Sequence, residues 1–314
     1  MSGLTLAAVE RFKADLSALI GEGRARLGVA VSGGPDSLAL LMLAHAAFPG
    51  DVMAATVDHG LRAESADEAV SVAAICADHS IPHETLRPAT PISGSTQAAA
   101  RVARYALLEQ WRAANAINWI ATGHHVDDQA ETLLMRLNRG AGVAGLAGVR
   151  AMNGQIIRPL LGWRRAELAI IVSQSGLSPI DDPSNRDPKY DRVRIRSALA
   201  QADWLNAENI ATCAALLAEA HTALEWASRN IEHERLVRGS ESVKMDPSLL
   251  PRELRRRLTL SALRHIDPAI APRGTALVEL IEALGRGETR TLGGVLCKGG
   301  ATWRFSRAAP RQKK

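Results

Sequence analysis

Short apolar runs alternate with amphipathic segments along roughly the first 140 residues. The runs that read as strands are RLGVAVSGG, DVMAATVDHG, PHETLRP and INWIATGHH. The segments with helical spacing of apolar residues cover 7–20, 35–47, 64–79, 95–114 and 126–137. Strands that alternate with helices of this length predict a Rossmann-like α/β fold, in which a parallel sheet is doubly wound.

The pattern changes near residue 207. A long amphipathic segment, 207–236, is followed by two shorter helical segments, 251–266 and 273–284. Two β-rich runs then flank the turn Lys298-Gly299-Gly300, which predicts a hairpin. Trp303 and Phe305 alternate on the last run, and core packing is favoured for them over stacking on a base. We expect a catalytic domain over 1–208 and a smaller, mainly helical domain over 209–314.

Composition is typical of a globular protein, with 46% hydrophobic and 23% charged residues among 314. The longest mostly apolar run, 38–48, is too short to cross a bilayer, and the N-terminus lacks the pattern of a secretory signal. Cys76, Cys213 and Cys297 are isolated, which argues against a disulfide framework or a metal knuckle. We therefore expect a cytoplasmic protein without a membrane partner, either a monomer or a homodimer.

Charge is distributed unevenly. Residues 1–210 hold 20 basic and 22 acidic side chains, whereas residues 211–314 hold 18 and 11. An excess of positive charge suggests an acidic partner, with nucleic acid the leading candidate and a solubilising surface the alternative. Phosphate contacts are expected from a basic helix face formed by Arg252, Arg255, Arg256 and Arg257.

The string Ser32-Gly33-Gly34-Pro35-Asp36-Ser37 follows the first expected strand and opens a helix. Its glycines let amides approach phosphate oxygens, Pro35 suits a first helical turn, and the helix start attracts anions. Ser32 and Ser37 add hydroxyl groups. No Gly-Lys-Ser/Thr follows, so this is not the P-loop of kinases. Asp36 suits a Mg²⁺ ion bound to phosphate. The string predicts an ATP site; a tight turn without ligand is the alternative.

Polar residues also follow the second and fourth expected strands. Asp58 and His59 would lie at the rim where an adenosine binds, with local hydrogen bonding as the alternative. Residues 122–132, TGHHVDDQAET, form the densest polar cluster. If a helix begins near His125, Asp128 and Glu131 share one face of it. Compensation of the helix dipole and a zinc site are the alternatives, although no second ligand group follows at metal spacing.

Five strings together resemble the tRNA(Ile)-lysidine synthetases in order and spacing. They are SGGPDS, VDHGLR, ARVARY, TGHHVDDQAETLLMRLNRGAGVAGLAG and DDPSNRDPKYDRVRIR. The first string by itself resembles the loop of the N-type ATP pyrophosphatases, or PP-loop proteins, which cleave ATP between the α and β phosphates. The likeness is close over about residues 25–200 and holds only in outline beyond them.

The resemblance implies a ligase that joins L-lysine to the wobble cytidine of an isoleucine tRNA with a CAU anticodon. ATP and Mg²⁺ would be used, and the cytidine would be adenylated before lysine displaces AMP. The residues expected to bind ATP are Ser32, Gly33, Gly34, Pro35, Asp36, Ser37, Asp58, His59, Gly123, Arg101 and Arg104.

The catalytic residues expected from the resemblance divide by role. Asp36 would hold Mg²⁺, Asp128 and Glu131 would pair with the ammonium groups of lysine, and His124 would contact phosphate or substrate. Arg192 would approach the reacting groups. The residues expected to contact RNA are Arg194, Arg196, Arg252, Arg255, Arg256 and Arg257. Solvated surface is the alternative for the arginines.

The sequence departs from the family at Arg192-Val193, where the usual pattern has Arg followed by Asn, and an expected proline is missing from SALAQADWL. A tRNA 2-thiolation enzyme of the same loop family is the alternative function, but it would be expected to carry paired cysteines. An amidotransferase lacks its glutaminase domain here, and an RNA-binding module would leave the phosphate loop unused.

Overall fold

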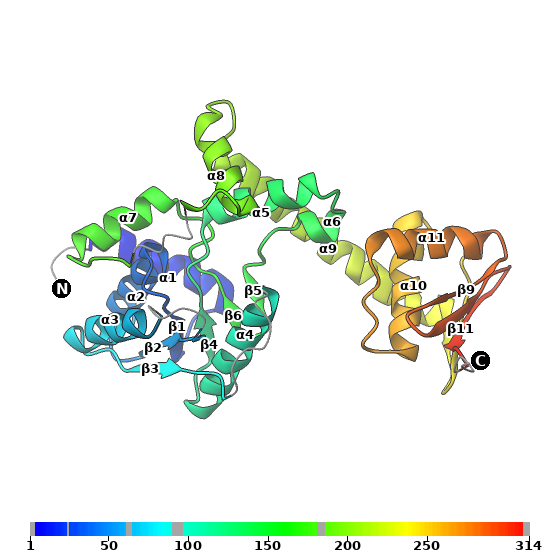
Figure 1. Ribbon diagram of the computed structural model, residues 1–314, viewed down its shortest axis with the longest axis horizontal. Helices are drawn as coiled ribbons and strands as arrows, with labels where there is room; N and C mark the ends of the chain where they lie inside the picture. Colours follow the sequence, from blue (N-terminus) through cyan, green and yellow to red (C-terminus); the bar gives the residue numbers. More distant parts are fainter. Residues whose placement is uncertain (1–3, 24, 61–64, 90–96, 181–185, 310–314) are drawn as a thin grey trace. The chain divides into compact units, whose positions relative to one another are not determined.

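The computed structural model describes residues 4–23, 25–60, 65–89, 97–180 and 186–309 (Figure 1). The chain divides into two compact units, residues 1–218 and 219–314, and each is described by itself. Helix α9 (Ala207–Arg235) contains the division, and the domain boundary expected at residue 208 falls in the same helix. The parts of the sequence prediction that fall outside the described residues are Leu61, Arg62, the helix starts at 64 and 95, and residues 181–185.

The first unit is built on a six-stranded sheet with the order β3-β2-β1-β4-β6-β5. Its strands are β1 (Leu27–Ala30), β2 (Val52–Val57), β3 (His83–Leu86), β4 (Trp119–Ala121), β5 (Met152–Asn153) and β6 (Ile156–Ile157). Every neighbouring pair is parallel except β5 with β6. The predicted parallel sheet is therefore confirmed. The sequence did not indicate β5 and β6, because two residues leave no alternation to detect.

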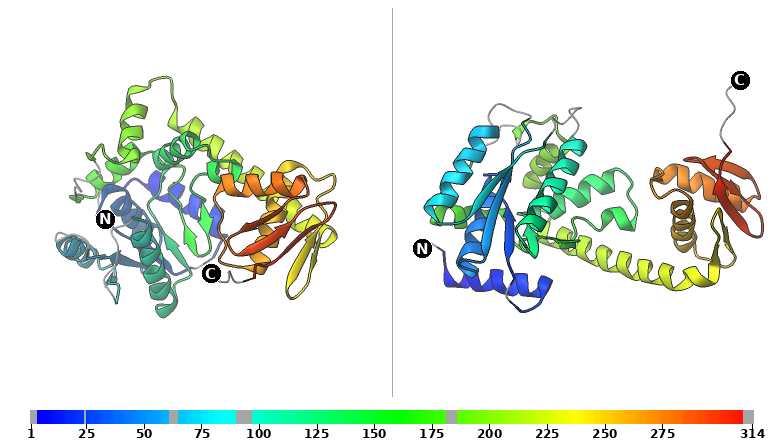
Figure 2. Two further views of the ribbon diagram at one scale, coloured as in Figure 1. Left: turned by 45° about the vertical axis from the view of Figure 1, so that its right-hand side comes forward. Right: turned by 90° about the horizontal axis from the view of Figure 1, so that it is seen from below.

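Helices cover both faces of this sheet (Figure 2). The helices of this unit that precede α9 are α1 (Leu6–Ile20), α2 (Pro35–Ala47), α3 (Ser65–Asp78), α4 (Gln97–Ala114), α5 (Val126–Asn138), α6 (Val143–Leu146), α7 (Arg165–Gln174) and α8 (Asp191–Gln201), and of these α5 packs against α6 and α8. One apolar core joins α1, α2 and α7 to β1 and β2, and a second joins α4 to the opposite face. Gly28 permits that second contact, because a Cβ there would lie 2.6 Å from the ring of Trp111.

Strands β1 and β4 are neighbours in the sheet, with Val29 paired to Ala121. Their carboxyl ends lead into α2 and α5. The chain leaves β1 toward β2 on one side, whereas β4 lies on the other side, so the strand order reverses between β1 and β4. Ligands of open α/β sheets bind at such a reversal. The topology therefore brings the phosphate string and the polar cluster of residues 122–132 to one place.

The second unit contains a five-stranded antiparallel sheet with the order β7-β8-β11-β10-β9. Its elements are β7 (Leu236–Arg238), β8 (Ser242–Met245), α10 (Arg252–Ile266), α11 (Gly274–Gly285), β9 (Thr289–Leu292), β10 (Val295–Lys298) and β11 (Trp303–Arg307). The hairpin predicted around 298–300 is confirmed as β10–β11. Trp303 and Phe305 are buried in the core with residues of α10 and α11, as predicted. β9 and β10 lie where one β-rich run was expected before the turn, whereas β7 and β8 were not expected.

Candidate active site

The phosphate loop lies between β1 and α2. Gly33 has φ of +81°, a conformation that glycine adopts without strain. Gly34 caps α2 without a side-chain hydrogen bond, so the first amides of the helix face the loop. The Ser37 hydroxyl accepts from the Ser32 amide at 3.1 Å and donates to the Gly34 carbonyl at 2.9 Å. This loop is shaped as an anion cradle at a helix N-terminus.

Two segments pack closely against the loop. A Cβ on Gly123 would lie 2.9 Å from the carbonyl oxygen of Asp36, so the β4–α5 connection touches the first turn of α2. A Cβ on Gly33 would lie 2.3 Å from Ile180, whose amide donates to the Gly33 carbonyl at 2.9 Å. Gly123 therefore joins the two halves of the site, which agrees with its predicted place there. The contact with Ile180 was not predicted.

His125 lies at the centre of the acidic cluster. Its side chain is fully buried, and its ring nitrogens lie 3.5 Å from carboxylate oxygens of Asp36, Asp127 and Asp128. Burial alone would lower the pKa of His125, but the carboxylates outweigh it and raise the pKa to about 9. The ring is therefore a buried cation that connects α2 to α5. The sequence prediction named His124 and not His125; the doubled histidine was the available signal.

Glu131 is the second centre, with its side chain 1% exposed. Its oxygens lie 2.7 Å from Arg196 Nε, 3.0 Å from Arg192 Nε and 3.3 Å from Arg165 Nη2. Arg192 also lies 3.7 Å from Asp128 Oδ1. The predicted shared face of Asp128 and Glu131 is thus confirmed. Three guanidinium groups from α7 and α8 already bind Glu131. Arg165 was not predicted, because no motif marks it.

His124 lies beside this cluster and hydrogen-bonds to Thr122 Oγ1 at 3.0 Å. The pKa of His124 is lowered to about 4, mainly by burial and also by Arg158, Arg101 and Arg192. Asp128 acts in the opposite direction. The imidazole is therefore neutral near pH 7. Arg158 was not predicted; its side chain is buried, and its Nε has no hydrogen-bond partner among the described residues.

Asp58, which was predicted at the rim of the adenosine site, is held by three hydrogen bonds. Asp58 is 6% exposed and accepts from Ser65 Oγ at 2.7 Å, from Arg87 Nε at 3.0 Å and from the Gly60 amide. The hydrogen bond from Ser65, with those from Gly60 and Arg87, lowers the pKa of Asp58. Its carboxylate thus organises the loop after β2.

The residues beside Asp58 contribute positive charge to the rim. Arg104 of α4 lies near His59, and burial together with this positive charge lowers the pKa of His59. Arg101 on the same helix stacks on Tyr105 at 5.1 Å and influences His124. Both arginines of α4 therefore lie near predicted ATP contacts.

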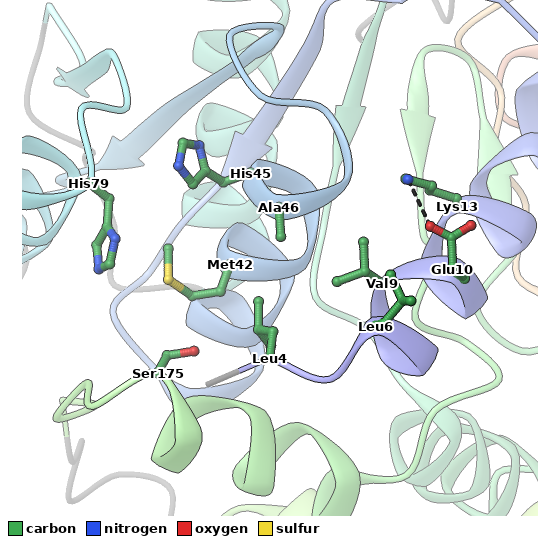
Figure 3. A pocket seen from close by; sticks show the side chains of 10 residues that line it. All are labelled: Leu4, Leu6, Val9, Glu10, Lys13, Met42, His45, Ala46, His79 and Ser175. Atoms are coloured by element: carbon green, nitrogen blue, oxygen red, sulfur yellow. Dashed lines mark hydrogen bonds and ion pairs between the residues drawn. The ribbon is translucent and has the colours of Figure 1, made fainter. Parts of the chain in front are cut away.

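A charged cavity of about 370 Å³ adjoins Glu131. It is lined by Asp127, Glu131, Asp203, Arg164, Arg165, Arg196, Leu199, Ala200, Leu205, Asn206 and Ala207. Carboxylates and guanidinium groups in one cavity suit a zwitterionic ligand. Another cavity, of about 420 Å³, is lined by Met42, His45 and His79 among others (Figure 3). It lies where α2 and α3 end, at the amino edge of the sheet, and contains none of the predicted site residues.

The predicted RNA contacts are held to different degrees. In the first unit, Arg194 is 63% exposed and pairs with Asp191, whereas Arg196 points to Glu131. In the second unit, Arg256 and Arg257 bind Glu253 and Arg255 donates to the Leu250 carbonyl. Arg252 is 79% exposed and lies 3.8 Å from Glu282. Arg252 and Arg194 are thus the most accessible of the six.

The predicted magnesium ligand, Asp36, has one oxygen that is buried without a hydrogen-bond partner among the described residues. Among the residues that the structure describes, no group of three or more histidine, cysteine or acidic side chains is arranged to hold a metal. Mg²⁺ needs only one or two carboxylates when substrate phosphates complete its shell. Asp36 beside the phosphate loop fits that donor set.

None of the helices that the structure describes is long and apolar enough to cross a membrane.

Comparison with known proteins agrees with this geometry. Residues 7–203 match the family model of the PP-loop domain, so sheet and loop define a PP-loop protein. The tRNA(Ile)-lysidine synthase of Novosphingobium aromaticivorans is 47% identical, over 96% of this chain and 94% of that protein. The synthase of Zymomonas mobilis is 44% identical, over 92% and 90%. The chain belongs to the tRNA(Ile)-lysidine synthase family.

A solved structure is similar in fold. The U34-tRNA thiolase NcsA from Methanococcus maripaludis has a TM-score of 0.55 and 16% identity, and the match covers 69% of this chain and 78% of that one. At this identity the likeness concerns the PP-loop fold alone.

Proposed function

We propose that this chain joins the ε-amine of L-lysine to the wobble cytidine of an isoleucine tRNA with a CAU anticodon, at the expense of ATP. The observation that carries the proposal is the meeting of the phosphate loop with the acidic start of α5. The same ring nitrogen of His125, Nε2, lies 3.5 Å from a carboxylate oxygen of Asp36 and 3.5 Å from one of Asp128. A nucleotide held in the loop is thus next to carboxylates that suit a cationic amine.

Two transfers account for the reaction. The cytidine carbonyl oxygen attacks the α-phosphorus of ATP, the bond to the β-phosphate oxygen breaks, and pyrophosphate leaves. The lysine amine then attacks the ring carbon that carries this oxygen. The bond between that carbon and the oxygen breaks, AMP leaves with the oxygen, and the amine loses a proton. The first transfer converts a poor leaving group into AMP, and the loop amides stabilise the charge on the phosphates.

The residues of the chain divide this work between them. Loop amides and the hydroxyls of Ser32 and Ser37 bind the phosphates. Asp36 would hold Mg²⁺, which neutralises phosphate charge when bound. Neutral His124, which Arg158 influences, is the further candidate for a contact with phosphate or substrate. Each of these roles follows from the side-chain chemistry.

Lysine would be held by the charged cavity and by the carboxylate of Asp128 next to it. Asp128 lies outside the cavity lining, and it has more capacity for an ammonium group than Glu131, because Glu131 already binds three arginines. The guanidinium groups of Arg164 and Arg165 in the cavity suit the carboxylate of an amino acid. Glu131 then contributes mainly by fixing the arginines.

Thiolation of tRNA would share the adenylation but needs a nucleophilic sulfur. Cys76 and Cys297 are buried, and burial raises the pKa of their thiols to about 11 and about 12. A thiol with a raised pKa is a poor nucleophile at neutral pH. Cys213 is exposed but has no second exposed cysteine beside it among the described residues, so the cysteines favour the ligase over sulfur delivery.

The test is incubation of the protein with ATP, labelled lysine and bulk tRNA. The expected result is label in tRNA only when ATP is present, with one pyrophosphate released for each lysine joined. Omission of lysine should leave pyrophosphate release detectable, because adenylation precedes attack. A folded protein that releases pyrophosphate but joins no lysine would contradict the proposal.

A further inference from the structure

The loop between α8 and α9 presents an aromatic side chain to solvent. Trp204 is 78% exposed, although tryptophan is a large apolar residue that folding normally covers. The loop is held in place around it: the Leu205 amide donates to the Ala202 carbonyl at 3.0 Å, and Asn206 caps α9 by accepting from the Asn209 amide at 2.9 Å. Trp204 is thus an exposed indole on a fixed turn.

The position of this turn connects it to the candidate active site. Asp203 and Leu205, on either side of Trp204, both line the charged cavity of about 370 Å³. Arg164, Arg165 and Arg196 line the same cavity and are each about one-third exposed. Trp204 itself is not part of the lining, so its indole lies next to a cavity that holds three guanidinium groups and the carboxylates of Asp127, Glu131 and Asp203.

This surface suits single-stranded RNA better than a protein partner. Protein interfaces have an apolar centre depleted of charge, whereas the cavity next to this turn is lined by three guanidinium groups and three carboxylates. An exposed aromatic ring close to arginines is a combination that binds unpaired bases and their phosphates. Any base offers a flat face for stacking, so the contact does not depend on which base stands there.

We propose that Trp204 is a stacking platform for an unpaired RNA base that flanks the base being modified. The inference rests on the proposed function, since it requires an RNA strand at the carboxyl edge of the sheet. When the target base enters the site, its neighbours remain outside, and the surface next to the charged cavity is where such a neighbour meets the indole. Trp204 is then a binding residue that takes no part in the transfers themselves.

The experiment measures binding of a fluorescein-labelled anticodon stem–loop RNA to the full chain by anisotropy, without ATP or lysine. Trp204→Ala should weaken binding about 5- to 100-fold, the range that removal of one base–aromatic stack produces. Trp204→Phe should retain most of the affinity, whereas Trp204→Leu should behave as Trp204→Ala, because leucine is apolar but has no flat face. The slope of affinity against salt should be unchanged, since no phosphate contact is removed.

Trp226→Ala is the matched control, because Trp226 on α9 is 66% exposed and lies outside the lining of the charged cavity. In the modification assay, Trp204→Ala should raise KM for tRNA and leave KM for ATP and lysine unchanged. Equal losses from Trp204→Ala and Trp226→Ala, full binding by Trp204→Leu, or an altered oligomeric state without altered RNA binding would overturn the inference. A wild-type chain that binds RNA through Trp204 but joins no lysine would overturn the proposed function alone.

Discussion

Asp36 has a buried oxygen without a hydrogen-bond partner among the described residues, and it stands in the first turn of the helix that follows the phosphate loop. An unsatisfied buried acceptor is costly unless a ligand completes it. Asp36→Asn keeps the shape but removes the charge that would hold Mg²⁺. We expect pyrophosphate release to fall about 100-fold or more, the scale of losing one preorganised electrostatic contact. The measurement is release at saturating ATP across a magnesium titration.

Asp67→Asn is the control for Asp36, because Asp67 also stands in the first turn of a helix, α3, but is exposed to solvent. It should leave pyrophosphate release within about twofold of wild type, as surface substitutions usually do. If Asp36→Asn kept full activity at every magnesium concentration, Asp36 would have no part in metal binding.

His124 gives a pH-dependent prediction. Its pKa is about 4 when folded, mainly because of burial, and about 6.5 in an unfolded chain. Between these values the unfolded chain binds the extra proton, so the contribution of His124 to the free energy of unfolding falls as pH falls from about 6.5 to about 4. His124→Gln should remove this loss, at most about 1.4 kcal/mol per pH unit. Urea unfolding of both proteins at each pH is the measurement.

The same substitution at His233, an exposed residue near the end of α9, is the control for His124. The wild type should lose stability relative to His124→Gln toward low pH, and the comparison with His233→Gln corrects for general acid effects. A constant difference between wild type and His124→Gln over this range would contradict a buried, neutral imidazole.

At the scale of elements, α8 is connected to α5 through Glu131. Arg192 and Arg196 are four residues apart on α8, so both reach Glu131, while Arg194 turns away. Glu131→Gln removes the negative charge from a buried position among three guanidinium groups. We expect a loss of about 2 kcal/mol in the free energy of unfolding, because a charged hydrogen-bond acceptor is lost but the arginines keep some solvent. Hydrogen exchange in α8 should accelerate.

The control for Glu131 is Glu109→Gln, since Glu109 makes a two-bond ion pair with Arg112 on the surface of α4. Exposed pairs contribute about 0.2–1 kcal/mol, so this variant should change little. If Glu131→Gln left exchange in α8 unchanged while raising KM for lysine, Glu131 would act on the substrate directly and not through α8.

The elements also show which parts of the molecule a sequence can reveal. The strand–helix alternation and the phosphate loop depend on residues close together in the sequence, so both could be predicted. Helix α2 begins and ends where expected, at Pro35 and Ala47. The contact of Glu131 with Arg196 joins residues 65 positions apart, and no local pattern encodes it. Arg192, Arg194 and Arg196 recur at every second position of a helix, so Arg194 cannot share the face that Arg192 and Arg196 turn to Glu131.

At the scale of the whole molecule, the chain has two compact units, and the cores are made of different residues. Each unit has one buried cysteine in an apolar core: Cys76 in the first unit and Cys297 in the second. Cys213 is exposed. Burial raises the pKa of both core thiols, so they are protected both by packing and by protonation. The three thiols therefore report on different parts of the fold.

We expect Cys213 alone to react with a thiol reagent in the native protein at pH 8. In rising urea, Cys76 and Cys297 should become reactive at different midpoints, because separate cores can unfold separately. The transition at Cys76 should be the steeper, since the slope scales with the surface that unfolding exposes and the first unit is the larger. Peptide mapping of the labelled cysteines in a Cys213→Ser background measures both. One shared midpoint with one slope would mean that α9, which continues from one unit into the other, couples them into a single cooperative structure.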